Sequence, residues 1–412
     1  MFSEYRGIPP QARLLVYLSF IPNVAIGFIY TDLSYFLPNV QKVSAGLPIA
    51  TMGITLVVLS IPFGILADRY GRRKMLILGN VCASLSLIGF ALTSALPLVL
   101  AVAVLEGTGE AAYAVSFVAM VADKAGNEKR TAAFSLLSFL GWVAGALGSF
   151  VISSVYGLEV FGLTFNQAHV VLFVVIGLLN LSITPVLLLV KDTSPRRKDR
   201  RILPRKSARV VAKYGVYSVL IAVGAGLFVP LMAYWFSAAY GVTDAVSGLV
   251  LGMTNLLTAG VVVVSPRLAR RVGLVKATVL TQASSTVFML VIPSAPNFGV
   301  AASLYLVRVF LMNLSNPLTQ SLIMGLVTPD ERGLASGVSA SLWRLPNALS
   351  ANVGYGFMAA GLLATPFYAA TGLYVVAIAL FWLLFKDSKL PEEAKTHPPA
   401  QESSVEGPEA ER

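Results

Sequence analysis

The sequence predicts an all-α integral membrane protein in which twelve transmembrane helices form two pseudo-symmetric six-helix halves. The chain has 412 residues, of which 56% are hydrophobic and only 12% are charged, and this is too apolar for an ordinary soluble protein. A dozen apolar stretches each approach the roughly 20 residues that cross a bilayer core about 30 Å thick. Helices are expected because an open sheet would leave backbone groups unpaired in hydrocarbon.

The predicted spans follow one another with short polar loops, which leaves no room for a sizeable soluble domain. They cover residues 12–38, 47–67, 75–94, 97–121, 132–156 and 168–190 in the first half, and 210–237, 244–265, 275–294, 297–327, 333–358 and 364–385 in the second. The first span is too long for the apolar region of a cleavable signal, and no small-residue cleavage site follows it, so we expect it to be retained.

The distribution of basic residues sets the expected orientation. With the N-terminus inside, 28 of the 31 lysines and arginines fall on the inner side, while Lys42 lies outside and Arg308 and Arg344 lie within spans. This asymmetry predicts a multi-pass protein of the cell membrane with both termini in the cytoplasm. The net charge of +11 is therefore interpreted as a topology signal that also meets anionic headgroups, and not as a nucleic-acid surface.

Residues 64–74, which read GILADRYGRRK, close the second span and open the third. This stretch resembles the loop signature of the major facilitator superfamily, which implies a secondary transporter that works by alternating access. Charged residues at helix ends suit the helix dipoles and can form a latch that breaks and remakes. The alternative is a tight turn that carries topology charges. The predicted cytoplasmic gate consists of Gly64, Asp68, Arg69, Gly71, Arg72 and Arg130.

A shift of 202 residues lays 266–273 (PRLARRVG) on the signature and also lays 329–332 on 127–130. The chain is therefore divided into an N-terminal half (1–190), a basic cytoplasmic linker (191–209), a C-terminal half (210–387) and a tail (388–412). The tail is rich in Glu, Pro, Ala and Ser, which predicts disorder. The solute site is expected between the halves near the middle of the membrane.

Ionisable residues inside spans are costly and mark candidate functional positions. Glu106 and Glu110 lie one helical turn apart on one face, and two carboxylates in a low dielectric repel, so we expect at least one to keep its proton near neutral pH. Glu110, Glu106 and Asp32 are the proton-coupling candidates. The 202-residue shift carries Glu106 onto Arg308, which leaves open a fixed ion pair between the halves or a cycling site.

The candidate solute-binding residues are two arginines and three neutral side chains. Arginine can hold a carboxylate or phosphate through two hydrogen bonds, and polar groups near a proline-broken helix fit a binding cavity. Aromatic side chains near the middle of a span are candidate cavity liners. The set is Arg308, Arg344, Tyr113, Trp142 and Asn316.

Residues 107–113 (GTGEAAY) resemble the fourth span of organic-anion symporters and of spinster-type lipid transporters. Asp32, followed by Leu37, Pro38 and Gln41, resembles the first span of the spinster group. These resemblances imply that Asp32 and Glu110 take part in proton coupling. The relatives carry an arginine seven residues before the glutamate, where this chain has Ala103. Drug antiporters usually carry a proline after the second glycine of a Gly-x-x-x-Gly segment, and this chain has Ala146 there.

The sequence therefore predicts proton-coupled symport of a small organic anion. The alternatives are a proton-driven exporter of amphiphilic, lipid-like or drug-like compounds and, in another class, a solute sensor that does not transport. No enzyme motif is present, Cys82 is the one cysteine, and two histidines are too few for a His/Cys metal cluster, so we expect no enzyme activity, metal or cofactor. The expected partners are a small solute, protons and the lipid bilayer, with no nucleic acid, and we expect a monomer.

Overall fold

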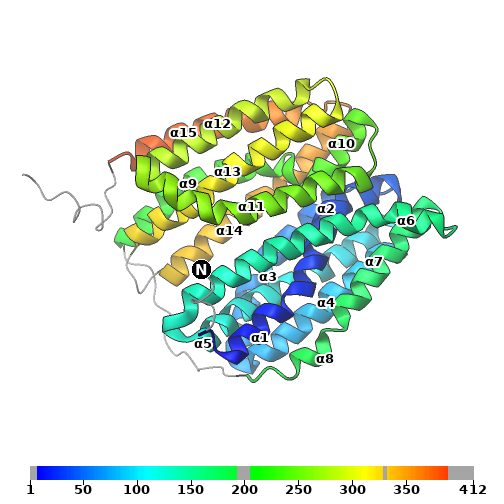
Figure 1. Cartoon of the computed structure of the whole chain (residues 1–412), viewed down its shortest axis with the longest axis horizontal. Helices are drawn as coiled ribbons and strands as arrows, with labels where there is room; N and C mark the ends of the chain where they lie inside the picture. Colours follow the sequence, from blue (N-terminus) through cyan, green and yellow to red (C-terminus); the bar gives the residue numbers. More distant parts are fainter. Residues whose placement is uncertain (1–6, 193–204, 328–331, 388–412) are drawn as a thin grey trace, which may run out of the picture.

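The computed structural model describes residues 7–192, 205–327 and 332–387, and in these ranges every regular element is a helix (Figure 1). The elements are α1 Pro10–Leu18, α2 Phe20–Asn39, α3 Gly46–Tyr70, α4 Arg72–Leu92, α5 Leu96–Val151, η1 Ile152–Ser154, α6 Val155–Val160, α7 Phe165–Leu181, α8 Thr184–Leu187, α9 Arg205–Gly226, η2 Val229–Leu231, α10 Met232–Tyr240, α11 Asp244–Val272, α12 Leu274–Val291, η3 Ile292–Ser294, α13 Phe298–Leu326, α14 Arg332–Ala359 and α15 Thr365–Phe385.

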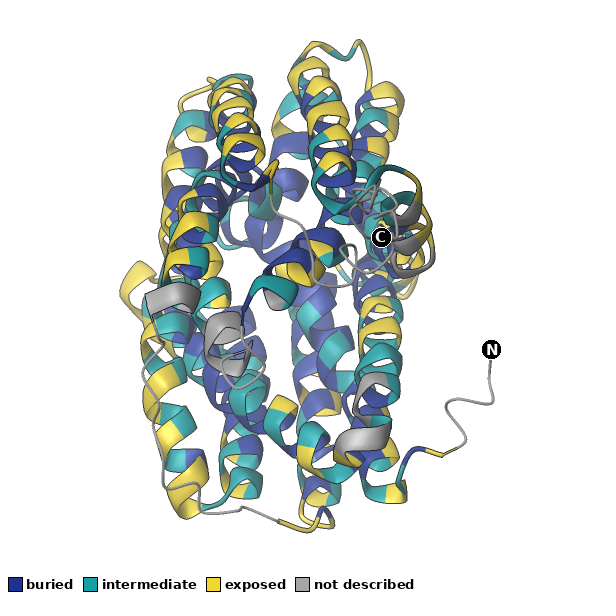
Figure 2. Ribbon diagram, turned by 90° about the vertical axis from the view of Figure 1, so that its left-hand side faces the viewer, coloured by how far each residue is buried: buried dark blue, intermediate teal, exposed yellow. Residues whose placement is uncertain are grey.

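The prediction of an all-α membrane protein is confirmed. Within the described residues, eleven segments are long and apolar enough to cross a membrane. The predicted span at 333–358, which is not among these eleven, is α14; this helix has 28 residues and carries Arg344 and Asn347 in its middle. Large apolar side chains such as Ile61 (72% exposed) and Leu383 (62% exposed) lie on the outside of the bundle, where Figure 2 shows exposed residues on the outer helix faces. Such surfaces are unfavourable in water and are solvated by lipid.

The element α5 contains two spans, Leu96–Gly126 and Ala132–Val160. Gly126 separates them with a non-helical backbone (φ 67°, ψ 178°), a positive φ that glycine adopts without a Cβ penalty. The second of these spans packs closely on α2, because a Cβ on Gly148 would clash with the carbonyl oxygen of Val24. Gly148 therefore has a helix-packing role.

The 202-residue repeat of the sequence is present in the backbone. Gly71 ends α3 with φ 105° and Gly273 ends α11 with φ 81°, and 273 − 71 = 202. The helices that follow, α4 and α12, begin at Arg72 and Leu274, at the same offset. Two structurally equivalent helix pairs therefore confirm the predicted pseudo-symmetry.

The helices α1–α8 and α9–α15 form two bundles that lie side by side (Figure 1). The C-terminal bundle has an aromatic core that includes Phe228, Trp235 and Phe381, and the N-terminal bundle has one that includes Phe28 and Phe173. The boundaries at 190 and 210 and the disordered tail stay predictions, since residues 193–204 and 388–412 lie outside the described ranges. An even number of spans places the start of α1 and the end of α15 on one side, called the termini side below.

Candidate functional site

A central cavity separates the two bundles. It consists of two adjoining volumes of about 570 Å³ and 610 Å³, a size typical of small-molecule sites. The two volumes share part of their lining, and so form one continuous space; the shared residues are Trp142, Val229, Thr254, Asn255, Tyr305 and Arg344. Both bundles contribute to this lining.

Glu110 joins the two bundles across the cavity. The Tyr30 hydroxyl of α2 donates a 2.6 Å hydrogen bond to Oε2 of Glu110. Arg344 of α14 donates to Oε1 at 3.0 Å and so forms an ion pair with the same carboxylate. The Arg344 side chain is 44% exposed and that of Glu110 is 14% exposed, so the pair faces the cavity and remains accessible to a solute.

Arg308 lies in the cavity wall without a carboxylate partner among the described residues. It is 4% exposed, its Nη2 donates to the Tyr374 hydroxyl at 3.0 Å, and its guanidinium lies 4.9 Å from the centre of the Phe228 ring. Its Nε atom is buried and makes no hydrogen bond. The described cavity thus contains two arginines and one carboxylate, Glu110, and one positive charge is not balanced.

Glu106 points away from this cavity. It is 3% exposed and accepts a short hydrogen bond from the Ser86 hydroxyl of α4. It also lines a separate small pocket of about 30 Å³, which Glu110 and Tyr113 share. The structure therefore brings Glu106 and Arg308 into no ion pair. Their positions are equivalent by pseudo-symmetry, but each side chain packs within its own bundle.

The other three candidate binding residues line the cavity. Tyr113 stacks on Phe117 with ring centroids 5.2 Å apart, and its hydroxyl is buried without a hydrogen-bond partner. Trp142 is 40% exposed at the junction of the two volumes. The side-chain amide of Asn316 donates a hydrogen bond to that of Asn313 at 2.9 Å. Both amides lie on the cavity wall formed by α13.

Asp32 does not line the central cavity. It is fully buried beside His169 and Asp244, and one oxygen or nitrogen atom from each of these three side chains lies within 4.8 Å of the other two. The structure therefore separates Asp32 from Glu110, although the sequence grouped them as titrating residues.

The predicted gate residues surround the turn between α3 and α4 on the termini side. Arg72 lies 3.4 Å from Asp68 and makes a closer ion pair with Asp123 of α5. Gly64 packs opposite Val115. Gly71 supplies the positive φ, and the Arg69 guanidinium lies 5.4 Å from the Tyr70 ring centre. The side chain of Arg130 lies outside the described residues.

A model of the Major Facilitator Superfamily matches residues 14–351 and, in a second match, residues 215–408. The chain belongs to this superfamily. As a major facilitator protein it is a secondary transporter of a small molecule, embedded in a membrane.

Curated and solved relatives of this superfamily member have several different substrates. The multi-drug resistance efflux pump PmrA of Streptococcus pneumoniae is 26% identical over 305 residues, which cover 69% of this chain and 73% of the pump. The nucleoside transporter NupG superimposes with a TM-score of 0.72 at 14% identity over 92% of this chain and 100% of NupG. A bacterial homologue of the human lysosomal transporter Spinster, in an inward-facing and unoccupied conformation, also gives 0.72 at 14% identity, over 92% and 98%.

The sequence did not indicate four polar partners of the candidate residues. Tyr30 and Tyr374 hydrogen-bond Glu110 and Arg308, and their distance along the chain gives no signal of this. Asp123 contacts Arg72; its acidic character at the end of the fourth span was the available signal. Asp244 lies beside Asp32, and its position at the start of a span was the available signal.

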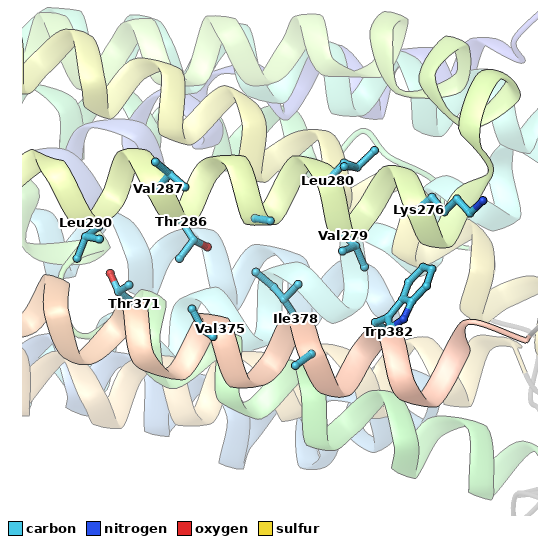
Figure 3. Close-up of a pocket in the computed structure, with 12 residues that line it drawn as sticks. Lys276, Val279, Leu280, Thr286, Val287, Leu290, Thr371, Val375, Ile378 and Trp382 are labelled. Atoms are coloured by element: carbon cyan, nitrogen blue, oxygen red, sulfur yellow. The ribbon is translucent and has the colours of Figure 1, made fainter.

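A groove of about 720 Å³ lies between α12 and α15 on the outside of the C-terminal bundle and is larger than either volume of the central cavity taken alone. Figure 3 shows apolar side chains such as Leu280 and Ile378 along its length and Lys276 at one end near Trp382. None of the charged cavity residues lines it. Its apolar walls face the lipid, so the candidate solute site remains the central cavity.

Proposed function

We propose that this transporter carries a small organic anion together with a proton. The observation that carries the proposal is the unbalanced charge of Arg308 in a cavity that already pairs Arg344 with Glu110. A guanidinium has five N–H donors, and the one hydrogen bond that the Arg308 guanidinium makes within the described structure goes to Tyr374. A carboxylate that accepts hydrogen bonds from the remaining donors would neutralise this buried charge. The planar guanidinium of arginine is suited to such binding, because two of its N–H groups match the two oxygens of a carboxylate.

Glu110 is the proposed coupling residue. Its ion pair with Arg344 and its hydrogen bond from Tyr30 connect α5 with α14 and α2. Protonation of Glu110 would remove the ion pair and leave Arg344 free to turn toward an anion in the cavity. Proton and anion would then each strengthen the binding of the other, as reciprocal linkage requires.

The gate and the orientation complete the proposal. Arg72 with Asp68 and Asp123 would hold the termini side of α3, α4 and α5 together in one state and release it in another. The excess of lysine and arginine on the termini side would face the cytoplasm of the cell. Glu106 is the weaker coupling candidate, because its side chain faces α4 and not the cavity.

The test is solute counterflow and proton-gradient-driven uptake in proteoliposomes, with a panel of carboxylates, sugars and cationic dyes. We expect Arg308→Ala to abolish both modes for carboxylates. Glu110→Gln should abolish gradient-driven uptake and retain counterflow, because the neutral amide resembles the protonated acid. Lys276→Ala, which removes a charge from the outer groove, is the matched control and should behave like the unmodified protein. Carboxylate counterflow that survives in Arg308→Ala contradicts the proposed anion site.

A second candidate is a proton-driven exporter of amphiphilic or drug-like compounds. The specific observations are the similarity to an efflux pump and the indole rings of Trp142 and Trp343 in the cavity wall, which can stack on apolar or cationic rings. The same panel decides between the two. Movement of dyes without movement of carboxylates favours the exporter.

A further inference from the structure

A second group of ionisable side chains joins the bundles at the end opposite the termini. It consists of Asp32 of α2, His169 of α7 and Asp244 of α11, which are 0%, 0% and 1% exposed. His169 belongs to the N-terminal bundle and Asp244 to the C-terminal one, and Nε2 of His169 makes a short hydrogen bond with Oδ2 of Asp244. We call these three residues the outer cluster.

The hydrogen bonds of His169 define where its protons lie. Nδ1 is 2.8 Å from the carbonyl oxygen of Phe165, and a carbonyl oxygen can only accept, so Nδ1 carries a hydrogen. If the ring is neutral, Nε2 carries no hydrogen and has a lone pair, and this lone pair repels the carboxylate oxygen of Asp244. The contact between Nε2 and Oδ2 therefore needs one additional proton, on the ring or on the carboxyl group.

The surroundings add no other positive charge. The carboxyl groups of Asp32 and Asp244 lie against each other, neither oxygen of Asp32 has a hydrogen-bond partner outside the cluster, and no lysine or arginine of the described residues forms an ion pair with the cluster. Tyr35 of α2 is a titratable group beside both aspartates, and Tyr156 of α6 hydrogen-bonds Thr243, the residue before Asp244; neither side chain is a cation. Buried carboxylates without a counter-charge are costly, so the cluster needs a cation.

One ligand atom from each side chain of the outer cluster lies within 4.8 Å of the others, a spacing that a metal ion also accepts. In the structure Nε2 of His169 makes a hydrogen bond with Oδ2 of Asp244, so we assign a proton to this position, and the test below includes a chelator to detect a metal ion.

We propose that the outer cluster is a second proton site, in which the proton shared by His169 and Asp244 latches the two bundles together and Asp32 is the neighbouring acceptor. Alternating access must separate α7 from α11 at this end, which breaks the shared hydrogen bond. The latched state holds the extra proton, so latching is favoured at low pH and lost as pH rises. The proposal adds to the proposed coupling at Glu110, but it requires neither an anion nor transport.

Distances between spin labels across this end test the latch directly. The labels are placed on Val160→Cys of α6, where the native side chain is 83% exposed, and on Ala238→Cys of α10, an exposed position in the other bundle. Cys82→Ala removes the native thiol. Double electron–electron resonance in lipid nanodiscs, without solute or gradient, is recorded from about pH 5 to about pH 8. We expect a short distance at low pH and a growing long-distance population at high pH, with the ratio changing by up to about tenfold per pH unit for one proton.

Two variants distinguish a contact that depends on the shared proton from a contact that is only structural. Asp244→Asn is nearly isosteric, and its amide can donate to Nε2 without a titrating proton, so we expect the short distance at every pH. His169→Phe removes the hydrogen bond and should give the long distance at every pH. Tyr35→Phe is the control and should retain the normal pH response.

The outcomes that overturn the proposal are equally direct. Asp244→Asn that titrates like the unmodified protein, or His169→Phe that keeps the short distance, shows that the shared proton does not hold the bundles together. A pH response that disappears on addition of a chelator assigns the cluster to a metal ion. Because the distances are recorded without solute or gradient, failure of the anion-symport proposal would not affect this result. Loss of the pH response in Glu110→Gln would place the sensing proton at Glu110.

Discussion

Replacement of Arg308 by alanine gives the sharpest test of the cavity. Arg308 is 4% exposed and is held by a 3.0 Å hydrogen bond to Tyr374 and by the Phe228 ring. Its unused donors leave room for two hydrogen bonds to a carboxylate. Loss of one partner of a buried charge-assisted pair typically costs about 2–5 kcal/mol. At 1.4 kcal/mol for each factor of ten, binding should weaken by roughly 30-fold to several thousand-fold.

The assay is equilibrium binding, in nanodiscs, of the radiolabelled carboxylate that shows the strongest counterflow in the unmodified protein. Arg308→Lys keeps the charge but loses the planar fork, so its affinity should lie between those of the unmodified protein and Arg308→Ala. Tyr374→Phe removes only the orienting hydrogen bond, which is worth about 0.5–1.5 kcal/mol, and should weaken binding by about threefold to tenfold. Monodisperse elution and unchanged thermal stability serve as the folding control. Binding by Arg308→Ala within about threefold of the unmodified protein would refute the reasoning, because even the smallest charge-assisted bond is worth more than that.

Three further results are expected. Tyr30→Phe removes the 2.6 Å hydrogen bond to the cavity carboxylate, worth about 1 kcal/mol, and should slow gradient-driven uptake by about fivefold with little change in counterflow; equal loss in both modes contradicts a coupling role. Asp123→Asn should reduce transport more than Asp68→Asn, because Asp68 is 53% exposed at 3.4 Å from its partner and exposed pairs contribute only about 0–1 kcal/mol; the reverse order in uptake rates argues against the proposed gate. Gly148→Leu should lower the thermal unfolding midpoint, since overpacking costs about 1–3 kcal/mol, while Gly157→Ala, with nothing within 4 Å, should leave it unchanged.

The turn between α3 and α4 shows what local sequence can predict. The motif at 64–74 placed a helix end, a glycine turn and a helix start, and the structure has Tyr70, Gly71 and Arg72 at those points. The same holds for its degenerate copy, where Gly273 adopts a positive φ. These helix ends and turns depend on residues that are neighbours in the sequence and on the bilayer as solvent. They can therefore be predicted from hydropathy and motif spacing.

The sequence did not predict which charged residues form a pair. Pseudo-symmetry suggested Glu106 with Arg308, but the ion pair across the cavity joins Glu110 to Arg344, 234 positions apart along the chain. A repeat relates equivalent positions; it does not bring them into contact. Which carboxylate faces the cavity depends on the rotation of α5 against α4, and that rotation is set by packing.

The sequence by itself determined the membrane fold, the repeat and the set of charged residues that the bilayer makes costly. The tertiary structure alone decided which of these share a site: Glu110 with Arg344 and Tyr30 in the cavity, and Asp32 with His169 and Asp244 at the opposite end. The physical reason is the distance along the chain over which each interaction acts. Solvation and helix formation act over one or two turns of the chain, whereas the pairing of buried charges follows from side-chain packing between helices that are far apart in sequence.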